Sequence, residues 1–292
     1  MKNIRIGTCI PGPAFESWIP ALIEKGFESF SINFHMQFDG VDLKELAAKV
    51  RTMLDGREIR ISALSYYCNA LLYEEHQQGL ERCIDLAHLF GTTVVSTFAG
   101  CLTGQSVDAS MPRFRKVFGE LTRRAEDKGV RIAIENCPMG GTWQCTTDNI
   151  GFNGKAWEMM FHEVSSPAIG LEWEPAHQIC QLVDPVPNLR KWVGRVVHVH
   201  GKDATINQDI LREQGIQSAD SFVDSRFPGM GQTDWRQIFT ILQQADFGGA
   251  VSIEGYHDLL FNRDWEMTGQ IHALNYLKWC RGGSYEPGPG TI

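Results

Sequence analysis

The segment Ile169–His177, with the sequence IGLEWEPAH, carries two carboxylates and an imidazole at the end of an otherwise apolar stretch. If this segment is a strand, successive side chains alternate between its faces, so Glu172 and Glu174 share one face and the apolar residues share the other. Pro175 has no N–H to donate to a sheet and therefore ends the strand, which leaves His177 about one turn beyond it. The pattern predicts a metal or substrate site at the end of this strand.

Three other apolar segments end in the same way, with polar side chains on one face and Val or Ile on the other. They are Arg131–Asn136, Val196–His200 and Ala250–Glu254. Their terminal polar residues are Glu135, His200 and Glu254, which are all potential metal ligands. Four segments of this kind are harder to obtain by accident than one isolated glutamate at the rim of a sheet.

The whole chain alternates short β-like segments with amphipathic helical ones, and it does so eight times. We predict strands at 4–9, 29–34, 59–65, 93–98, 130–135, 169–174, 196–200 and 250–254. We predict helices at 15–25, 43–55, 74–90, 112–128, 155–164, 185–193, 234–245 and 263–280. Eight such units without a break in composition indicate an α/β protein with a single (β/α)8 TIM barrel over residues 1–281. The Gly- and Pro-rich residues 282–292 would form a flexible tail.

An open, doubly wound sheet is the alternative fold, but it needs no eighth repeat and no GxGxxG motif follows the first strand. Two connections are unusually long for either fold, 137–154 and 204–233. The first contains several glycines and Trp143, and we expect it to cover the site. The second contains Arg226 just before a Pro-Gly turn, where its guanidinium is able to face the same opening.

The composition is that of a globular protein, with 292 residues of which 43% are hydrophobic and 21% charged. A formal net charge of −8 argues against a nucleic-acid partner, which normally requires a basic patch. No segment reaches the roughly 18 apolar residues of a membrane span, and no secretory signal pattern opens the chain, so we expect a cytoplasmic protein without a membrane partner. The eight cysteines include no CxxC pair and are typical of reduced thiols.

In a parallel barrel the carboxyl ends of all strands converge on one face, so Glu135, Glu174, His200 and Glu254 would meet there. Three carboxylates brought together repel one another, and a divalent cation is the simplest remedy. Oxygen and nitrogen donors in this mixture favour Mn, Mg or Co, and Zn is also compatible. We interpret Glu172 and His198 as a buried pair that supports these ligands rather than as direct ligands.

The motifs also resemble a known family. In chain order they are IENCP at 134–138, GLEWEPAH at 170–177, HVHGKD at 198–203, RFPGMG at 226–231 with Asp234 and Trp235, and SIE at 252–254. They resemble the sugar phosphate isomerase/epimerase family of xylose isomerase-like TIM barrels, and the match spans most of the chain. The resemblance implies one divalent metal on the four residues named above, with Glu135 and Glu254 doubling as acid and base.

The resemblance also implies a small carbohydrate as substrate, a sugar, a sugar phosphate or a polyol. It assigns substrate contacts to His177 and Arg226, and we add His35, Trp143 and Lys202. Trp143, Tyr66 and Tyr67 fit packing as well as they fit stacking against a substrate. His35 fits a surface position as well as it fits a position in the pocket. A homo-oligomer, either a dimer or a tetramer, is compatible with the sequence.

The chain departs from the family pattern at Glu174, where Asp is usual, so Glu172 is a candidate to join the metal. Proton transfer through an enediolate gives an isomer, an epimer or, with loss of a hydroxyl, the product of an inosose-type dehydratase. An apurinic-site endonuclease on the same barrel is a rival, but its Asp-x-His motif is replaced here by Asp224-Ser225-Arg226. A sugar-binding protein without turnover is the third class.

Overall fold

The computed structural model describes residues 3–283 and contains a closed barrel of eight parallel strands. Around the barrel the order is β1-β10-β7-β6-β5-β4-β3-β2. The strands are β1 (Arg5–Pro11), β2 (Ser29–His35), β3 (Arg60–Tyr67), β4 (Val94–Thr97), β5 (Arg131–Glu135), β6 (Ile169–Trp173), β7 (Val196–Gly201) and β10 (Ala250–Ile253). The predicted (β/α)8 barrel is confirmed, and every predicted strand is present with bounds that differ by at most two residues.

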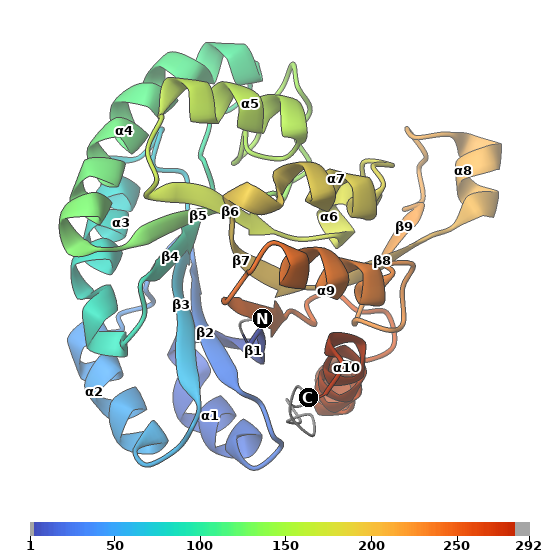
Figure 1. The fold of residues 1–292 in the computed structure, drawn as a ribbon. Coiled ribbons are helices and arrows are strands. Elements are labelled where there is room, and N and C mark those ends of the chain that lie inside the picture. Colours follow the sequence, from blue (N-terminus) through green and yellow to red (C-terminus); the bar gives the residue numbers. More distant parts are fainter. Residues whose placement is uncertain (1–2, 284–292) are drawn as a thin grey trace, which may run out of the picture.

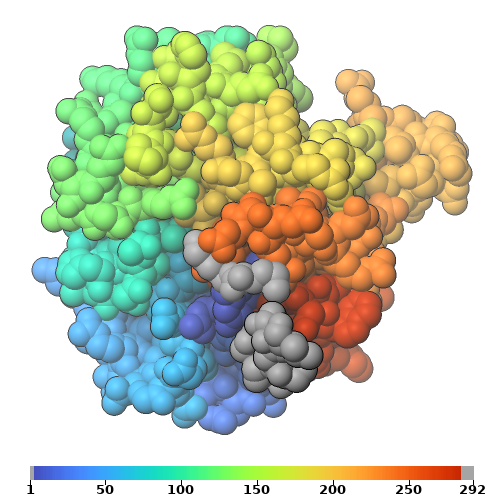
Figure 2. Space-filling model, viewed as in Figure 1, coloured from blue at the N-terminus to red at the C-terminus, as the bar shows by residue number. Residues whose placement is uncertain are grey.

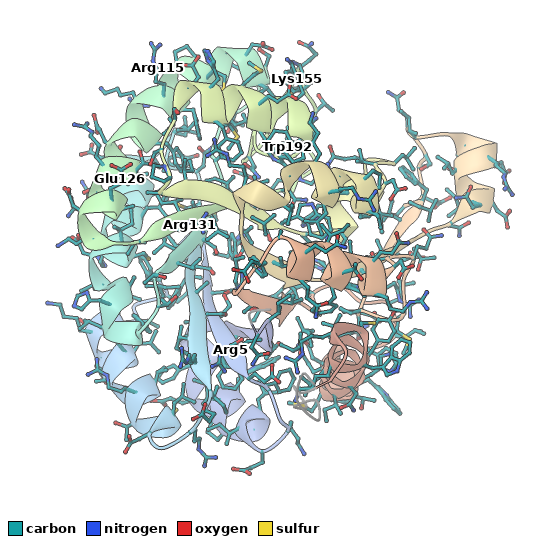
Figure 3. All side chains as sticks on the ribbon, viewed as in Figure 1. Arg5, Arg115, Glu126, Arg131, Lys155 and Trp192 are labelled. Atoms are coloured by element: carbon teal, nitrogen blue, oxygen red, sulfur yellow. The ribbon has the colours of Figure 1, made fainter. Side chains whose placement is uncertain are left out.

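Helices follow the strands and form an outer layer around the barrel (Figure 1). They are α1 (Phe15–Ile23), α2 (Leu43–Leu54), α3 (Glu74–Leu86), α4 (Val107–Lys128), α5 (Gly154–Glu163), α7 (Pro185–Trp192), α9 (Trp235–Gln244) and α10 (Glu266–Arg281). A short helix, α6 (Ala176–Ile179), follows β6 directly, and four 3₁₀ turns lie at 12–14, 87–90, 193–195 and 263–265. Long charged side chains such as Arg115 and Lys155 point outward from this layer into solvent (Figure 3).

The start of α4 differs from the sequence prediction, which placed it at Pro112. The helix begins five residues earlier, because the hydroxyl of Ser106 accepts a hydrogen bond from the N–H of Ala109 and caps it. Proline is common in the first turn of a helix, which made Pro112 an attractive start, yet here it lies inside the helix. At the other end Gly129 adopts a left-handed conformation with φ of 65°, which ends the helix as predicted.

The main core fills the space between the barrel and the helices. Its largest fully buried side chains include Trp157, Trp173 and Trp235. Because the apolar residues of the strands pack outward against the helices, their polar partners on the opposite face are directed into the barrel. This division positions the acids and imidazoles of β5, β6, β7 and β10 toward one another.

The long connection 204–233 contributes to a second, antiparallel sheet. Strands β8 (Asp203–Ile206) and β9 (Val223–Arg226) pair, and helix α8 (Gln208–Gln214) joins them. The segment projects from the barrel (Figures 1 and 2). Asp203 holds its base, because Oδ1 accepts hydrogen bonds from the backbone and hydroxyl of Thr233 and Oδ2 accepts one from the indole of Trp235.

The C-terminal helix is fastened to the start of the barrel. Both Nη atoms of Arg281 donate to the carboxylate of Glu28, at 2.6 and 3.0 Å, and that carboxylate also accepts from the N–H of Ile6. Among residues 3–283, no helix combines the length and the apolar character needed to cross a membrane. Residues 284–292, most of the predicted tail, lie outside the described part of the chain.

Candidate metal centre and active site

Four side chains from neighbouring strands converge at the carboxyl end of the barrel. Glu135 is the last residue of β5, Glu174 follows β6, His200 lies at the end of β7 and Glu254 follows β10. One ligand atom from each lies within 4.8 Å of every other. The strand order brings them together, because β5, β6, β7 and β10 are consecutive neighbours in the barrel.

The imidazole of His200 lies at the centre of this cluster. Its Nδ1 atom is 2.9 Å from Glu135 Oε1, 3.0 Å from Glu254 Oε2 and 3.4 Å from Glu174 Oε2. A single ring nitrogen has at most one proton, so it is unable to satisfy three carboxylates. Both oxygens of Glu174 and Oε2 of Glu254 are buried and lack a hydrogen-bond partner among the described residues.

The other ring nitrogen of His200 faces a second set of polar groups. Nε2 is 3.1 Å from the hydroxyl of Tyr67 and 3.3 Å from Glu172 Oε1. Tyr67 donates its own proton to Glu172 Oε2 at 2.8 Å, so its oxygen is free to accept from Nε2. In a neutral imidazole this pattern favours the proton on Nε2, which would direct the lone pair of Nδ1 at the three carboxylates. A cation between them would satisfy that lone pair and the carboxylates together.

Glu172 and His198 lie beside this cluster and are paired with each other, at 2.6 Å between Oε1 and Nδ1. Nε2 of His198 is 3.0 Å from the hydroxyl of Ser252. Although Glu172, His198 and His200 also lie close enough to hold an ion, their polar atoms already have hydrogen-bond partners. The two clusters therefore differ, because only the one around Nδ1 of His200 has unpartnered carboxylate oxygens.

Burial and mutual repulsion affect the titration of the unpaired acids. Burial raises the pKa of Glu174 to about 8 and the pKa of Glu135 to about 7. Burial acts the same way on Glu254, but the ammonium of Lys202, 2.7 Å from Oε1, and the nearby His200 hold the pKa of that carboxyl well below its usual range. A divalent cation would replace the protons that Glu135 and Glu174 otherwise retain. The donor set, three carboxylate oxygens and one imidazole nitrogen, thus fits Mn, Mg or Co, and also Zn.

A cavity of about 740 Å³ opens above the cluster, within the size range of small-molecule sites. Glu135, His177, Lys202 and Glu254 contribute to one part of its wall. Tyr67, Phe98 and His35 contribute aromatic rings to another part, with His35 at an exposed position at the end of β2. Carboxylates, an ammonium group and aromatic faces together suit a polar ligand with an apolar side, such as a sugar or polyol ring.

Two predicted substrate contacts are not among the residues that line this cavity. The indole of Trp143 donates to Asp108 at the start of α4, at 2.8 Å, because the loop 137–154 folds back onto that helix. Nε of Arg226, on β9, lies 3.3 Å from Asp258 Oδ2. Trp143 also packs against the core, and the guanidinium of Arg226 is engaged with a carboxylate.

Three residues near the site have roles that the sequence analysis did not predict. Tyr67 orients His200, as described above. Asn136 joins the ends of β5 and β6, since its amide exchanges two hydrogen bonds with the backbone of Glu174 at 2.7 and 2.9 Å. Cys137 lines the cavity two residues after Glu135, on the same alternation. The alternation of side chains along β5 would have predicted that Cys137 faces the cavity, as Glu135 does. The roles of Tyr67 and Asn136 depend on contacts between strands, which the sequence does not reveal.

A (β/α)8 barrel with a cation-compatible cluster at the carboxyl ends of its strands defines the class of this protein. A family model described as xylose isomerase-like TIM barrel matches residues 19–278, and the chain belongs to that family. The chain is 25% identical over 250 residues to an inosose dehydratase from Clostridium beijerinckii, a match that covers 78% of this chain and 79% of that protein.

Solved structures of sugar epimerases have the same fold. An L-ribulose 3-epimerase superposes with a TM-score of 0.68 at 15% identity and covers 98% of this chain and 100% of that one. The 3-keto-D-glucoside 4-epimerase YcjR from E. coli superposes with a TM-score of 0.69 at 16% identity, and the match covers 96% of this chain and 99% of that one. At this identity the likeness establishes the fold, and the chemistry has to be argued from the site.

Proposed function

We propose that the protein is a sugar or polyol isomerase or epimerase that uses one divalent cation held by Glu135, Glu174, His200 and Glu254. The observation that carries this proposal is the position of His200 Nδ1, which lies within 3.4 Å of three carboxylates beneath the cavity. Membership of a family with sugar epimerases among its structural neighbours supports it. When bound there, the cation would polarise a substrate carbonyl and acidify the adjacent C–H group.

In this proposal Glu135 and Glu254 transfer the proton. They lie at the ends of β5 and β10, which are three positions apart around the barrel, so they approach a molecule in the cavity from different sides. Two carboxylates on opposite sides of one carbon allow removal of a proton from one face and its return to the other.

Lys202 makes the two glutamates unequal. It is 5% exposed and donates from Nζ to Glu254 Oε1, while Oε2 of the same carboxylate faces His200. This contact lowers the basicity of Glu254, whereas no ammonium group of residues 3–283 binds Glu135. We therefore assign the initial proton removal to Glu135 and the return of a proton to the side of Glu254 and Lys202. His177, beside Lys202 in the cavity wall, would donate a hydrogen bond to a substrate oxygen.

A second candidate, an inosose-type dehydratase, is favoured by the same Lys202–Glu254 pair. Glu135 would remove the proton beside the carbonyl, and the C–O bond of the neighbouring hydroxyl would break. An ammonium donor on the far side stabilises the departing hydroxide, which leaves as water once it is protonated, and the product is an unsaturated ketone. Similarity over more than three quarters of the chain to a protein named inosose dehydratase supports this alternative.

The test uses Mn²⁺-loaded protein in heavy water with a panel of free ketoses, phosphorylated ketoses and cyclic polyol ketones, followed by NMR. An epimer or isomer with deuterium at the reacting carbon supports the main proposal, and an unsaturated ketone supports the dehydratase. Glu135→Gln should abolish exchange while keeping an oxygen for the cation. Binding of a sugar without any exchange at carbon would instead favour a non-catalytic binding protein, and three zinc ions per chain would favour a nuclease.

A further inference from the structure

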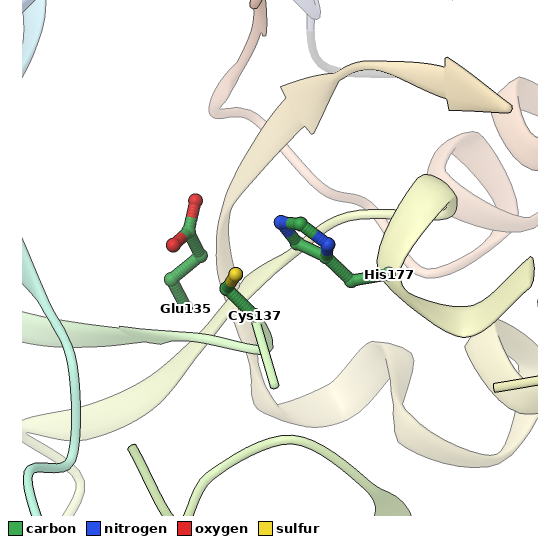
Figure 4. A group of neighbouring side chains, drawn as sticks. All are labelled: Glu135, Cys137 and His177. Atoms are coloured by element: carbon green, nitrogen blue, oxygen red, sulfur yellow. The ribbon is translucent and has the colours of Figure 1, made fainter. Parts of the chain in front are cut away.

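A second group of ligand-type side chains lies on the cavity side of the proposed metal centre. Glu135, Cys137 and His177 each direct one donor atom into a common space, with all three atoms within 4.8 Å of one another. Figure 4 shows a ring nitrogen of His177 directed toward the carboxylate of Glu135 and the sulfur of Cys137. Bonds from zinc to nitrogen and sulfur are about 2.0–2.3 Å long, so shifts of tenths of an ångström would let one ion reach all three.

The acids shared with the first centre have oxygens to spare for this space. Glu135 places Oε1 next to Nδ1 of His200 and retains a second oxygen. Glu174 places Oε2 on the His200 side and Oε1 3.1 Å from Nε2 of His177. Glu174 is fully buried, and although both imidazoles lie within ion-pair distance, neither of its oxygens accepts a hydrogen bond from residues 3–283. This unpartnered carboxylate faces both clusters and is an observation independent of the cysteine.

We propose that this space is a second cation site, formed by Glu135, Cys137 and His177 with Glu174 beside them, that selects thiophilic ions. A ligand set of sulfur, nitrogen and oxygen suits Zn²⁺, Co²⁺ or Cd²⁺ and does not suit Mn²⁺ or Mg²⁺, which prefer oxygen. Three protein ligands leave a position open for water or a substrate oxygen. On binding, the thiol of Cys137 loses its proton to solvent, and the sulfur–metal bond replaces the S–H bond.

The second site bears on the proposed function, on which this inference rests for the identity of the first. The oxygen of Glu135 that would take the substrate proton is the one that a cation at the second site would bind. A carboxylate that bridges two cations has no oxygen left for a base, so a thiophilic ion would inhibit an enzyme that Mn²⁺ activates. The inference thus predicts which metals support turnover and which suppress it.

Metal-free protein titrated with Co²⁺ alone tests the site without a substrate. The wild type should bind two equivalents, one of them accompanied by the near-ultraviolet charge-transfer band of a thiolate–cobalt bond, whereas Mn²⁺ should bind once. Cys137→Ser should remove the band and lower the affinity for the second Co²⁺ by at least about tenfold. Loss of a group that only hydrogen-bonds to a metal ligand already costs about 10–100-fold in affinity, and Cys137 would be a ligand itself. The single Mn²⁺ equivalent of the variant should remain, which also reports that the variant is folded.

Cys145→Ser is the matched control, since Cys145 lies exposed on the same loop. The control should keep both equivalents and the band. The second site is refuted if wild-type protein binds one Co²⁺ without the band, or if Cys137→Ser keeps two equivalents. Failure of the first centre gives a different result, because the Mn²⁺ equivalent is then absent from all three proteins.

Discussion

Replacing Tyr67 with Phe tests how much the orientation of His200 contributes to metal binding, because the change leaves all four proposed ligands in place. The change removes one oxygen, which accepts from His200 Nε2 at 3.1 Å and donates to Glu172 at 2.8 Å. Glu172 Oε1 remains 3.3 Å from Nε2, so the imidazole loses one of two partners rather than both. Loss of such partners typically costs about 10–100-fold in metal affinity, and the surviving contact places this variant near the lower end, at about tenfold or 1.4 kcal/mol.

Titration of metal-free protein with Mn²⁺, followed by the spin resonance of the free ion, measures this change directly. Tyr66→Phe is the matched control, because the adjacent hydroxyl donates to the carbonyl of Met36 and touches none of the four ligands. Equal affinity in Tyr67→Phe and the wild type would refute the assignment of the proton to Nε2. A similar loss in Tyr66→Phe would show that the effect comes from the strand and not from the hydrogen bond.

Three further outcomes follow from the contacts. Glu135→Gln and Glu254→Gln should each lower kcat by at least about 10²-fold while Mn²⁺ still binds. Steady-state kinetics on the substrate identified by NMR will measure this loss. Near-normal turnover in both variants would exclude the two-glutamate mechanism. Arg226→Ala should lower the free energy of unfolding by about 1 kcal/mol through loss of its pairing with Asp258 and leave the metal content unchanged, as denaturant titration and elemental analysis will measure. Glu28→Gln should destabilise the fold by about 1–2 kcal/mol at pH 7 in urea unfolding, and a loss that persists undiminished at pH 3 would contradict the pairing with Arg281.

The pH dependence of the Glu28 variant follows from the direction of its pKa. Burial alone would raise the pKa of Glu28, but the hydrogen bonds from Arg281 and Ile6 lower it below its ordinary value. A lowered pKa in the folded state means that the stabilisation is complete above the unfolded-state pKa and disappears as the pH falls through the folded-state value. The difference between wild type and variant should therefore shrink below about pH 4.

Strand alternation carried most of what the sequence could predict. Because side chains on a strand alternate between two faces, the polar residues of IGLEWEPAH and VVHVH had to share the inside of a barrel once eight strand and helix units were recognised. The same alternation, applied to the residue after the strand, would also have identified Cys137. Convergence of Glu135, Glu174, His200 and Glu254 follows from strand order, and the structure brings their atoms within 4.8 Å.

What the sequence could not predict depends on contacts between distant segments. Trp143 was expected over the substrate because it lies in a long loop, yet the loop contributes a hydrogen bond to Asp108 and packs the indole on the core. The antiparallel sheet of β8 and β9 lacks a strong alternating apolar pattern in the sequence. Asp203 holds this sheet in place by accepting hydrogen bonds from Thr233, thirty positions away. The partners of Tyr67 lie more than a hundred positions along the chain.

The central claim is that a cation lies between Nδ1 of His200 and three carboxylates. An anomalous difference map of crystals grown with Mn²⁺ and a bound polyol tests it most directly. One strong peak is expected in contact with Nδ1 of His200 and with oxygens of Glu135, Glu174 and Glu254, with polyol oxygens on the cavity side of that peak. A peak at Nε2 of His200, or no peak within reach of Nδ1, would contradict the account.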